Sequence, residues 1–204
     1  MFSFFVNSFA FAQELPKAEL KEDDQKNNVL SFYEYEASDH YMIIRLWLYK
    51  DSNFYFTLSS FNRDVFSEGK WHQKDDTLTL NSSLEQDNIP VNLSYTDSTN
   101  RKNNFKIGEI RNLKGKEMVD GLVAVNDRSN TCIPSYRICN NQLNSIDSIK
   151  IVFESGPSSK WLKISRQNYS QIIPVVQVNF MISNYQFFDN RKFRVLKSSV
   201  IPIQ

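Results

Sequence analysis

The side chains that most often transfer protons or bind metal ions are scarce in this sequence. It contains two histidines, His40 and His72, and His72 is followed closely by Asp75 and Asp76. No H-E-x-x-H motif, H-x-H pair or D-x-[DN]-x-[DN]-G loop occurs, and these are short patterns that hold zinc and calcium in proteins. We therefore predict no metal site and no cofactor, and we interpret both histidines as exposed residues of strands or turns.

Nucleophilic and carboxylate mechanisms also leave no clear trace in the sequence. A Ser-His-Asp triad is assembled in space, but no G-x-S-x-G motif is present to place a serine on a sharp turn. Glycoside hydrolysis needs two carboxylates that meet in space. The glutamates formally available are Glu34, Glu36, Glu68, Glu85 and Glu154. Their neighbours distinguish none of them from a solvated surface residue, so we name no catalytic residue.

The two cysteines of the chain, Cys132 and Cys139, lie in a polar, loop-like stretch at residues 129–142. An even number of closely spaced cysteines predicts a disulfide in an oxidising compartment. Two buried free thiols are the second interpretation. A metal site is the third, but the spacing is longer than C-x₂₋₄-C and no histidine is near in sequence.

The N-terminus predicts an exported protein. Residues 1–12 form an uncharged, aromatic-rich run that ends in Ala-x-Ala at Ala10 and Ala12, and the stretch that follows Gln13 is polar and charged. This combination predicts a signal peptide that is cleaved between Ala12 and Gln13, although the usual basic n-region is absent. The alternative is an apolar edge strand. With the signal peptide, we expect a periplasmic or secreted protein.

Charge and hydropathy limit the partners that this chain can have. The 204 residues include 24 basic and 23 acidic side chains, for a net charge of +1. This balance gives no long-range field for phosphate, so we expect no nucleic-acid partner. No uncharged apolar stretch is long enough for a bilayer span. The phosphate-binding motifs G-x-G-x-x-G and G-x-x-x-x-G-K-[ST] are absent, which excludes the nucleotide enzymes that use them.

The composition favours strands over helices. The chain has 16 Phe, 9 Tyr and 3 Trp but only 5 Gly, and alanine is equally scarce. Aromatic enrichment with little alanine suits half-buried pleated surfaces. We therefore predict an all-β protein, an antiparallel β-meander followed by a β-sandwich, with little or no helix.

Hydrophobic periodicity divides the chain into regions. Alternating apolar and polar residues predict two hairpins, at 41–60 and 65–80, that together form a four-strand meander. Short strands separated by turn signals then continue to the C-terminus, which is typical of a sandwich. We expect a polar N-terminal segment at 13–30, a β-meander region at 31–84 and a β-sandwich region at 88–204. One continuous sandwich is the alternative.

Basic residues gather near the C-terminus, between apolar residues. They are Arg191, Lys192, Arg194 and Lys197. One interpretation is a patch that binds an acidic ligand, a polysaccharide or a loop of a partner protein. The alternative, which we favour, is an edge strand whose outward charges prevent aggregation.

The tryptophans are candidates for a sugar-stacking platform. They are Trp47, Trp71 and Trp161. Single tryptophans on strands more often pack in a core or at its rim, and we favour that interpretation here.

The meander resembles a pattern of small secreted or envelope proteins of the Bacteroidetes type, and a similar pattern occurs in lipocalin-like barrels. The pattern Gly-x-Trp, four residues, Asp-Thr-Leu-x-Leu runs from Gly69 to Leu80. The resemblance covers about forty residues, at 41–82. It implies a strand-rich envelope protein, or a barrel that holds a small apolar ligand.

A second resemblance lies at residues 109–164, which are similar to carboxypeptidase-regulatory-like, transthyretin-type sandwiches. The matching segments are Val-Ala-Val-Asn at 123–126 and Ile-Asp-Ser-Ile-Lys-Ile at 146–151. The family's usual turn between them is replaced by the segment that holds the cysteines. The resemblance implies a module for binding, scaffolding or spacing, and it transfers no catalytic residue.

These observations lead to three functional expectations. The first is an exported, non-catalytic binding module of a bacterial cell envelope, with an envelope protein or a glycan as partner. The second is a lipocalin-like binder of a small apolar ligand. The third is a secreted hydrolase whose site the sequence does not reveal.

Overall fold

A computed structural model describes residues 13–96, 107–126, 130–139, 145–165 and 169–203. The protein is all-β, with almost no helix. It divides into two compact units. The first contains the described residues up to Leu84 and from Asn184 onward, and the second spans Glu85–Ser183.

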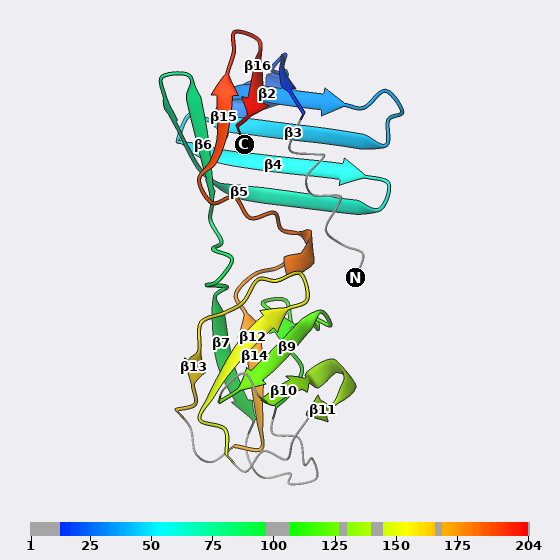
Figure 1. Cartoon of the computed structure of the whole chain (residues 1–204), viewed down its shortest axis with the longest axis vertical. Helices are drawn as coiled ribbons and strands as arrows, with labels where there is room; N and C mark the ends of the chain where they lie inside the picture. The colour runs from blue at the N-terminus through cyan, green and yellow to red at the C-terminus, as the bar shows by residue number, and fades with distance from the viewer. Residues whose placement is uncertain (1–12, 97–106, 127–129, 140–144, 166–168, 204) are drawn as a thin grey trace. The chain divides into compact units, whose positions relative to one another are not determined.

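The first unit is a closed barrel of eight strands (Figure 1). Its strands are β1 (Leu15–Ala18), β2 (Val29–Glu36), β3 (Met42–Tyr49), β4 (Asn53–Ser60), β5 (Arg63–Lys74), β6 (Thr77–Ser82), β15 (Arg191–Val195) and β16 (Ser199–Pro202). Around the barrel they follow the order β1-β16-β15-β6-β5-β4-β3-β2, and every pairing is antiparallel. The short helix α2 (Glu22–Lys26) lies between β1 and β2 in the chain.

This strand order is that of an up-and-down barrel with one interruption. Each barrel strand pairs with the next barrel strand along the chain, and β16 closes the ring on β1. Between β6 and β15 the chain leaves the barrel and forms the second unit. The second unit is therefore an insertion in one connection of a continuous antiparallel barrel.

The predicted four-strand meander is confirmed. Strands β3 to β6 pair in sequence with uninterrupted registers. Both hairpin turns contain a non-glycine residue with left-handed backbone, Ser52 at φ 64° and Asp75 at φ 54°. Small polar residues tolerate that conformation in tight turns, which is why the polar turn signals marked the hairpins correctly.

The barrel interior is a packed apolar core. Alternate residues of the strands point inward, as the period of a strand requires, and their side chains fill the space that the strands enclose. The core consists of Leu15, Tyr33, Ile44, Leu46, Leu48, Phe54, Phe56, Leu58, Val65, Leu78, Leu80, Phe188, Phe193 and Val200.

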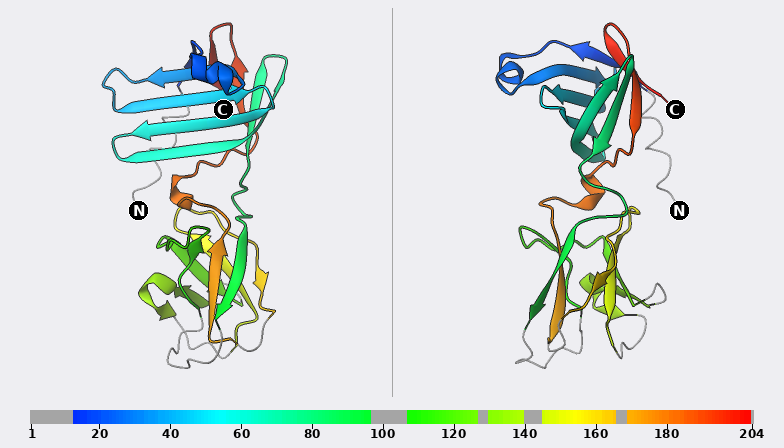
Figure 2. Two further views of the ribbon diagram at one scale, coloured as in Figure 1. Left: turned by 180° about the vertical axis from the view of Figure 1, so that it is seen from behind. Right: turned by 90° about the vertical axis from the view of Figure 1, so that its left-hand side faces the viewer.

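The second unit contains two sheets (Figure 2). One has five strands in the order β11-β10-β9-β12-β13, and the other has three in the order β7-β14-β8. The strands are β7 (Val91–Thr96), β8 (Arg111–Asn112), β9 (Gly121–Val125), β10 (Asn130–Ile133), β11 (Ile138–Cys139), β12 (Ser148–Phe153), β13 (Leu162–Lys163) and β14 (Gln171–Val176). Two 3₁₀ turns complete the elements: η1 (Pro134–Tyr136) and η2 (Ile182–Asn184).

The structure divides the chain differently from the expected 31–84 and 88–204 regions. Residues from Asn184 onward belong to the barrel, where β15 pairs with β6 through Phe193 and Leu78. The expected polar segment at 13–30 supplies β1, whose Leu15 is buried. Both differences arise because barrel closure depends on pairing between distant segments, which local periodicity does not report.

Candidate binding site

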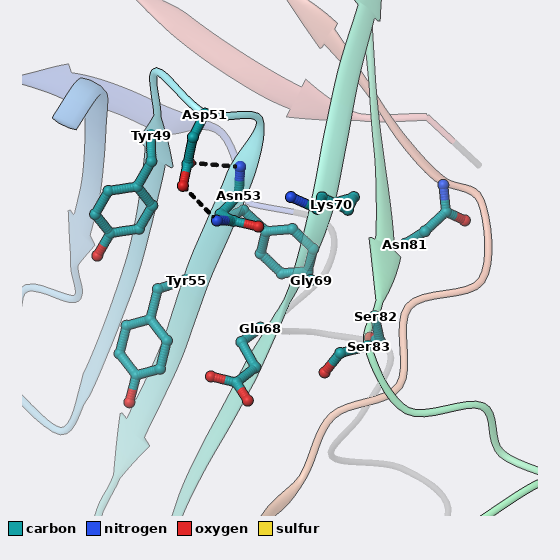
Figure 3. A pocket seen from close by; sticks show the side chains of 11 residues that line it. Tyr49, Asp51, Asn53, Tyr55, Glu68, Gly69, Lys70, Asn81, Ser82 and Ser83 are labelled. Carbon is teal, nitrogen blue, oxygen red and sulfur yellow. Dashed lines mark hydrogen bonds between the residues drawn. The ribbon is translucent and has the colours of Figure 1, made fainter. Parts of the chain in front are cut away.

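The barrel carries a pocket of about 640 Å³ on β3 to β6 (Figure 3). This volume lies within the range of small-molecule sites, roughly 300–1,000 Å³. The lining residues are Tyr49, Asp51, Asn53, Phe54, Tyr55, Glu68, Gly69, Lys70, Asn81, Ser82 and Ser83. We call this site the barrel pocket.

Strand register determines which side chains line the barrel pocket. Tyr55 of β4 lies opposite Glu68 of β5. Asn53 of β4 lies opposite Lys70 of β5, and Lys70 in turn lies opposite Asn81 of β6. The inward-facing neighbours belong to the core, so these residues project from the outer face. Neighbouring cross-strand pairs therefore bring polar and aromatic side chains together on the outer face.

Gly69 allows β5 and β6 to approach closely at the pocket. A Cβ atom at this position would lie 2.0 Å from the main-chain oxygen of Asn81 and 2.8 Å from the Cα of Ser82. Real side chains do not tolerate such contacts, because backbone atoms cannot move away cheaply. The glycine of the Gly-x-Trp pattern is thus explained by a close contact between backbones.

Hydrogen bonds fix the turn at one end of the pocket. The carboxylate of Asp51 accepts bonds from the Asn53 main-chain N–H at 3.1 Å and from its side-chain amide at 2.6 Å. The indole N–H of Trp71 donates to the main-chain oxygen of Tyr49 at 3.0 Å. These bonds hold the ends of β3 and β4 beside β5 and give the pocket a defined shape.

The opposite wall is held by the chain that returns from the second unit. The Ser82 hydroxyl accepts a 2.7 Å bond from the Phe188 N–H and lies 2.9 Å from the Ser67 hydroxyl. The buried Tyr185 hydroxyl donates to the main-chain oxygen of Glu68 at 2.8 Å and lies 3.2 Å from the Ser83 hydroxyl. The wall is therefore fixed by residues far apart in sequence.

Several polar groups of the pocket remain available to a ligand. Within the described part of the chain, no hydrogen bond or ion pair is made by the Glu68 carboxylate, the Lys70 ammonium group or the hydroxyls of Tyr49 and Tyr55. Burial raises the pKa of Tyr55, and the nearby charge of Glu68 raises it further. Both tyrosine hydroxyls are therefore protonated at neutral pH and can donate hydrogen bonds.

A row of aromatic rings leads from the pocket across the barrel surface. The ring centroids of Tyr55 and Trp47 are 5.8 Å apart, and those of Trp47 and Phe32 are 5.0 Å apart in a stacked arrangement. In the other direction, Phe66 lies 6.1 Å from Tyr55. Trp47 and Phe66 are half-buried, so the row offers ring surface that continues from the pocket.

The second unit has smaller pockets with different linings. One, of about 350 Å³, lies on β9, β10 and β12 and includes Lys150 and Asp87. Another, of about 160 Å³, includes Arg111 and Arg137, and Arg111 is paired with Glu109 at 3.0 Å. The barrel pocket is larger than either and is bounded by described residues on four consecutive strands.

The residues considered for catalysis are dispersed. Both histidines are exposed, and His40 lies 2.6 Å from Glu36. Glu34 pairs with Arg45 across β2 and β3. Of the candidate glutamates, only Glu68 lines the barrel pocket. Among the described residues, no group of three or more His, Cys, Asp or Glu side chains could hold a metal ion.

The cysteine region forms a hairpin in the second unit. Cys132 is buried and disulfide-bonded. The register of β10 and β11 places the backbone of Cys139, the other cysteine of the sequence, directly opposite Cys132. Between these strands, η1 places Tyr136 at the surface, 73% exposed.

The basic residues near the C-terminus do not form an edge strand. β15 is paired on both sides, with β6 and with β16, so the favoured interpretation was wrong. Barrel closure supplies the second neighbour. Arg191 lies 5.9 Å above the Phe193 ring on one face, whereas Lys192 and Arg194 are exposed on the other, and Lys197 follows the strand. Strand alternation therefore divides this set of charges between two faces.

The three tryptophans lie in different surroundings. Trp47 lies in the aromatic row, Trp71 packs against the barrel core, and Trp161 is 39% exposed in the second unit. Within the barrel, Trp47 and Trp71 therefore lie on different faces of the sheet. The proposed cleavage site at Ala12 and Gln13 follows a segment, 1–12, that lies outside the described residues.

Sequence reasoning did not single out the pocket as a site. Tyr49, Tyr55, Lys70 and Asn81 are ordinary strand residues in the sequence, and no motif marks them. Period-two alternation indicates which residues of one strand share a face, but the pairing of Tyr55 with Glu68 also depends on the turn between β4 and β5. The opposite wall of the pocket also depends on hydrogen bonds from the returning segment, at Tyr185 and Phe188.

Comparisons with protein-family models, with curated proteins and with solved structures gave no match. The candidate function therefore depends on the geometry of this chain alone. No helix among the described residues is both long and apolar enough to cross a bilayer.

Proposed function

We propose that this protein is an exported, non-catalytic binding module of a bacterial cell envelope, and that the barrel pocket is its ligand site. The observation that carries the proposal is the pocket itself: about 640 Å³, held at one end and along the opposite wall by hydrogen bonds, with unpaired polar groups and three aromatic residues in its lining. A site whose walls are already held by hydrogen bonds loses little conformational entropy when a ligand binds.

Export is supported by the cysteine chemistry and by the N-terminal pattern. Disulfides persist in oxidising compartments and are rare in the cytosol. Cys132 is disulfide-bonded, and the sequence up to Ala12 has the composition of a signal peptide. We also propose that the two sheets of the second unit form the expected β-sandwich, which serves as a spacing or interaction module.

The packed barrel core favours surface binding over the lipocalin-like alternative. A lipocalin-like binder needs space inside the barrel, whereas large side chains such as Phe54, Phe56 and Phe193 fill this interior. The hydrolase alternative receives little support. The second carboxylate of the pocket, Asp51, accepts two hydrogen bonds from Asn53 in the turn, whereas hydrolysis with two carboxylates needs both of them to flank the scissile bond.

Cosedimentation with insoluble envelope fragments tests the proposal. The full chain, purified from an exporting host, is mixed with washed fragments of a Gram-negative envelope, and bound and free protein are measured after centrifugation. We expect the protein to sediment and the Tyr55→Ala variant to remain largely soluble. Tyr136→Ala, which removes an exposed tyrosine of the second unit, is the matched control and should sediment normally.

Two results would count against the proposal. If the protein stays in solution with every fragment preparation, the proposed binding role is wrong. Release of soluble products from the fragments, lost in a Glu68→Gln variant, would show that the pocket is catalytic.

A further inference from the structure

We propose that the barrel pocket binds a neutral carbohydrate, with Tyr55 as the ring on which a sugar stacks. This inference rests on the proposed function and specifies its ligand class. It follows from the charges, the hydrogen-bonding groups and the aromatic surface of the pocket taken together.

The charge of the pocket excludes strongly charged ligands. Asp51 and Glu68 are acidic and Lys70 is basic, so the lining carries two negative charges and one positive charge. A phosphate group or other polyanion would be repelled by the two carboxylates. A cation held between the tyrosine rings would be opposed by the Lys70 ammonium group on the neighbouring strand.

The polar groups suit a ligand that both donates and accepts hydrogen bonds. Glu68 only accepts, Lys70 only donates, and the hydroxyls of Tyr49, Tyr55 and Ser83 can do both. Burying an apolar ligand against these groups would leave them without water or partners, at a cost of roughly 1–3 kcal/mol for each group. Sugar hydroxyls, by contrast, can pair with every one of them.

The aromatic groups supply the remaining element of sugar recognition. One face of a pyranose ring presents C–H groups, which pack against the electron-rich face of an aromatic ring. Tyr55 lines the pocket and continues into Trp47 at 5.8 Å along the aromatic row. A ligand of two or more sugar units would place one unit in the pocket and the next along Trp47.

Calorimetric titration of the full chain with defined probes tests this inference. The probes are maltose, cellobiose, lactose and N,N′-diacetylchitobiose, compared with inorganic phosphate, choline and decanoate. We expect at least one disaccharide to bind and the three comparison probes not to bind. Tyr55→Ala should weaken disaccharide binding about tenfold, the loss of one good aromatic contact.

Milder variants keep the test valid if Tyr55→Ala fails to fold. Tyr55→Phe retains the ring and should bind more tightly than Tyr55→Ala, whereas Lys70→Met removes the donor group from an exposed position and should weaken binding. Tyr136→Ala should bind like the wild type. Absence of disaccharide binding, binding insensitive to Tyr55 and Lys70, or preference for phosphate, choline or decanoate would each overturn the inference.

Periodate treatment of the envelope fragments separates failure of the inference from failure of the proposed function. Periodate cleaves sugars that carry free neighbouring diols, whereas 4-linked N-acetylamino sugars resist it. If treated and untreated fragments bind the protein equally, Tyr55→Ala weakens both, and no disaccharide probe binds, N,N′-diacetylchitobiose included, the binding function stands and the carbohydrate assignment is wrong. If binding is lost only after periodate treatment, the assignment is supported.

Discussion

The hydroxyl of Tyr185 donates a 2.8 Å hydrogen bond to the main-chain oxygen of Glu68. Tyr185 is among the first residues of the segment that returns to the barrel, and Glu68 lines the barrel pocket. The same hydroxyl accepts from the Leu84 N–H at 3.5 Å, at the point where the chain leaves the barrel. One buried side chain of the returning segment therefore contacts both the segment that leaves the barrel and a residue of the barrel pocket.

Tyr185→Phe should destabilise the barrel by about 1–2 kcal/mol, because it removes one hydroxyl from a buried site and leaves polar groups without a partner. The ring contact with Phe66, at 5.4 Å, would remain. Denaturant unfolding monitored by circular dichroism measures the change. Tyr136→Phe, at an exposed position, is the control, and equal unfolding midpoints for the two variants would contradict the prediction.

Gly69→Ala should cost about 3 kcal/mol or more, because the added methyl group overlaps the backbone of β6. Gly115→Ala provides a useful contrast. Gly115 has φ 77° with open space around it, so its substitution costs only the left-handed strain, about 1 kcal/mol. The melting temperatures of the two variants measure this difference. A Gly69 variant as stable as the Gly115 variant would show that β5 and β6 can move apart at this position.

Reduction of the disulfide should destabilise the second unit and leave the barrel unchanged. A disulfide that closes a short loop contributes about 2 kcal/mol. Hydrogen exchange measured by mass spectrometry, with and without reductant, follows each unit separately. We expect faster exchange at Thr131 and Ile133 of β10 and no change at Leu46 or Leu78, and a barrel that also loosens would disprove the independence of the two units.

Asp120→Asn should make the protein relatively more stable as the pH rises. Burial raises the pKa of Asp120 above its usual value, and the charge of Glu154 raises it further. The folded state then holds the proton more tightly than the unfolded state, so the wild type loses stability as the pH rises from the unfolded pKa through the folded pKa. Asparagine has no proton to lose.

Unfolding of the Asp120→Asn variant at pH 3 and pH 7 checks this sign. The stability difference should favour the variant at neutral pH and shrink at acidic pH. Glu154→Gln should reduce the pH dependence of the wild-type stability, because it removes a charge that raises the pKa of Asp120 in addition to burial. A difference that does not change with pH would contradict the assignment.

Replacement of Glu85–Ser183 by a short Gly-Ser linker should leave a folded barrel with an intact pocket. The Leu84 N–H lies 3.5 Å from the Tyr185 hydroxyl, so a few residues suffice to join the two ends. Disaccharide titration and thermal unfolding of the shortened chain provide the measurement. Aggregation, or loss of cooperative unfolding, would show that the barrel depends on the second unit.

Local pattern was enough to predict part of this fold. The hairpins of β3 to β6 were predicted because alternation is regular there and polar residues such as Ser52 and Asp75 mark the turns. Closure of the barrel was not predicted. It depends on β1, which is only 4 residues long, and on its pairing of Leu15 with Val200 at the opposite end of the sequence.

The site was harder to predict than the strands. The register of β4 and β5 brings Tyr55 and Glu68 together, and it depends on the turn between the two predicted hairpins. The pocket also needs the close approach at Gly69 and the hydrogen bonds of Phe188 and Tyr185 to the opposite wall. The hydrogen bonds of Phe188 and Tyr185 join segments about a hundred residues apart, and a single sequence has no local signal for them.

The insertion between β6 and β15 affects the entropy cost of closing the barrel. In the second unit, Val91 of β7 lies opposite Val176 of β14, and the Gln177 N–H donates to the Pro90 oxygen at 2.8 Å. Folding of this unit thus brings its own two ends together. Closing a long flexible loop costs entropy, and a loop already folded removes most of that cost. We therefore expect β15 to join β6 faster once β7 and β14 have paired.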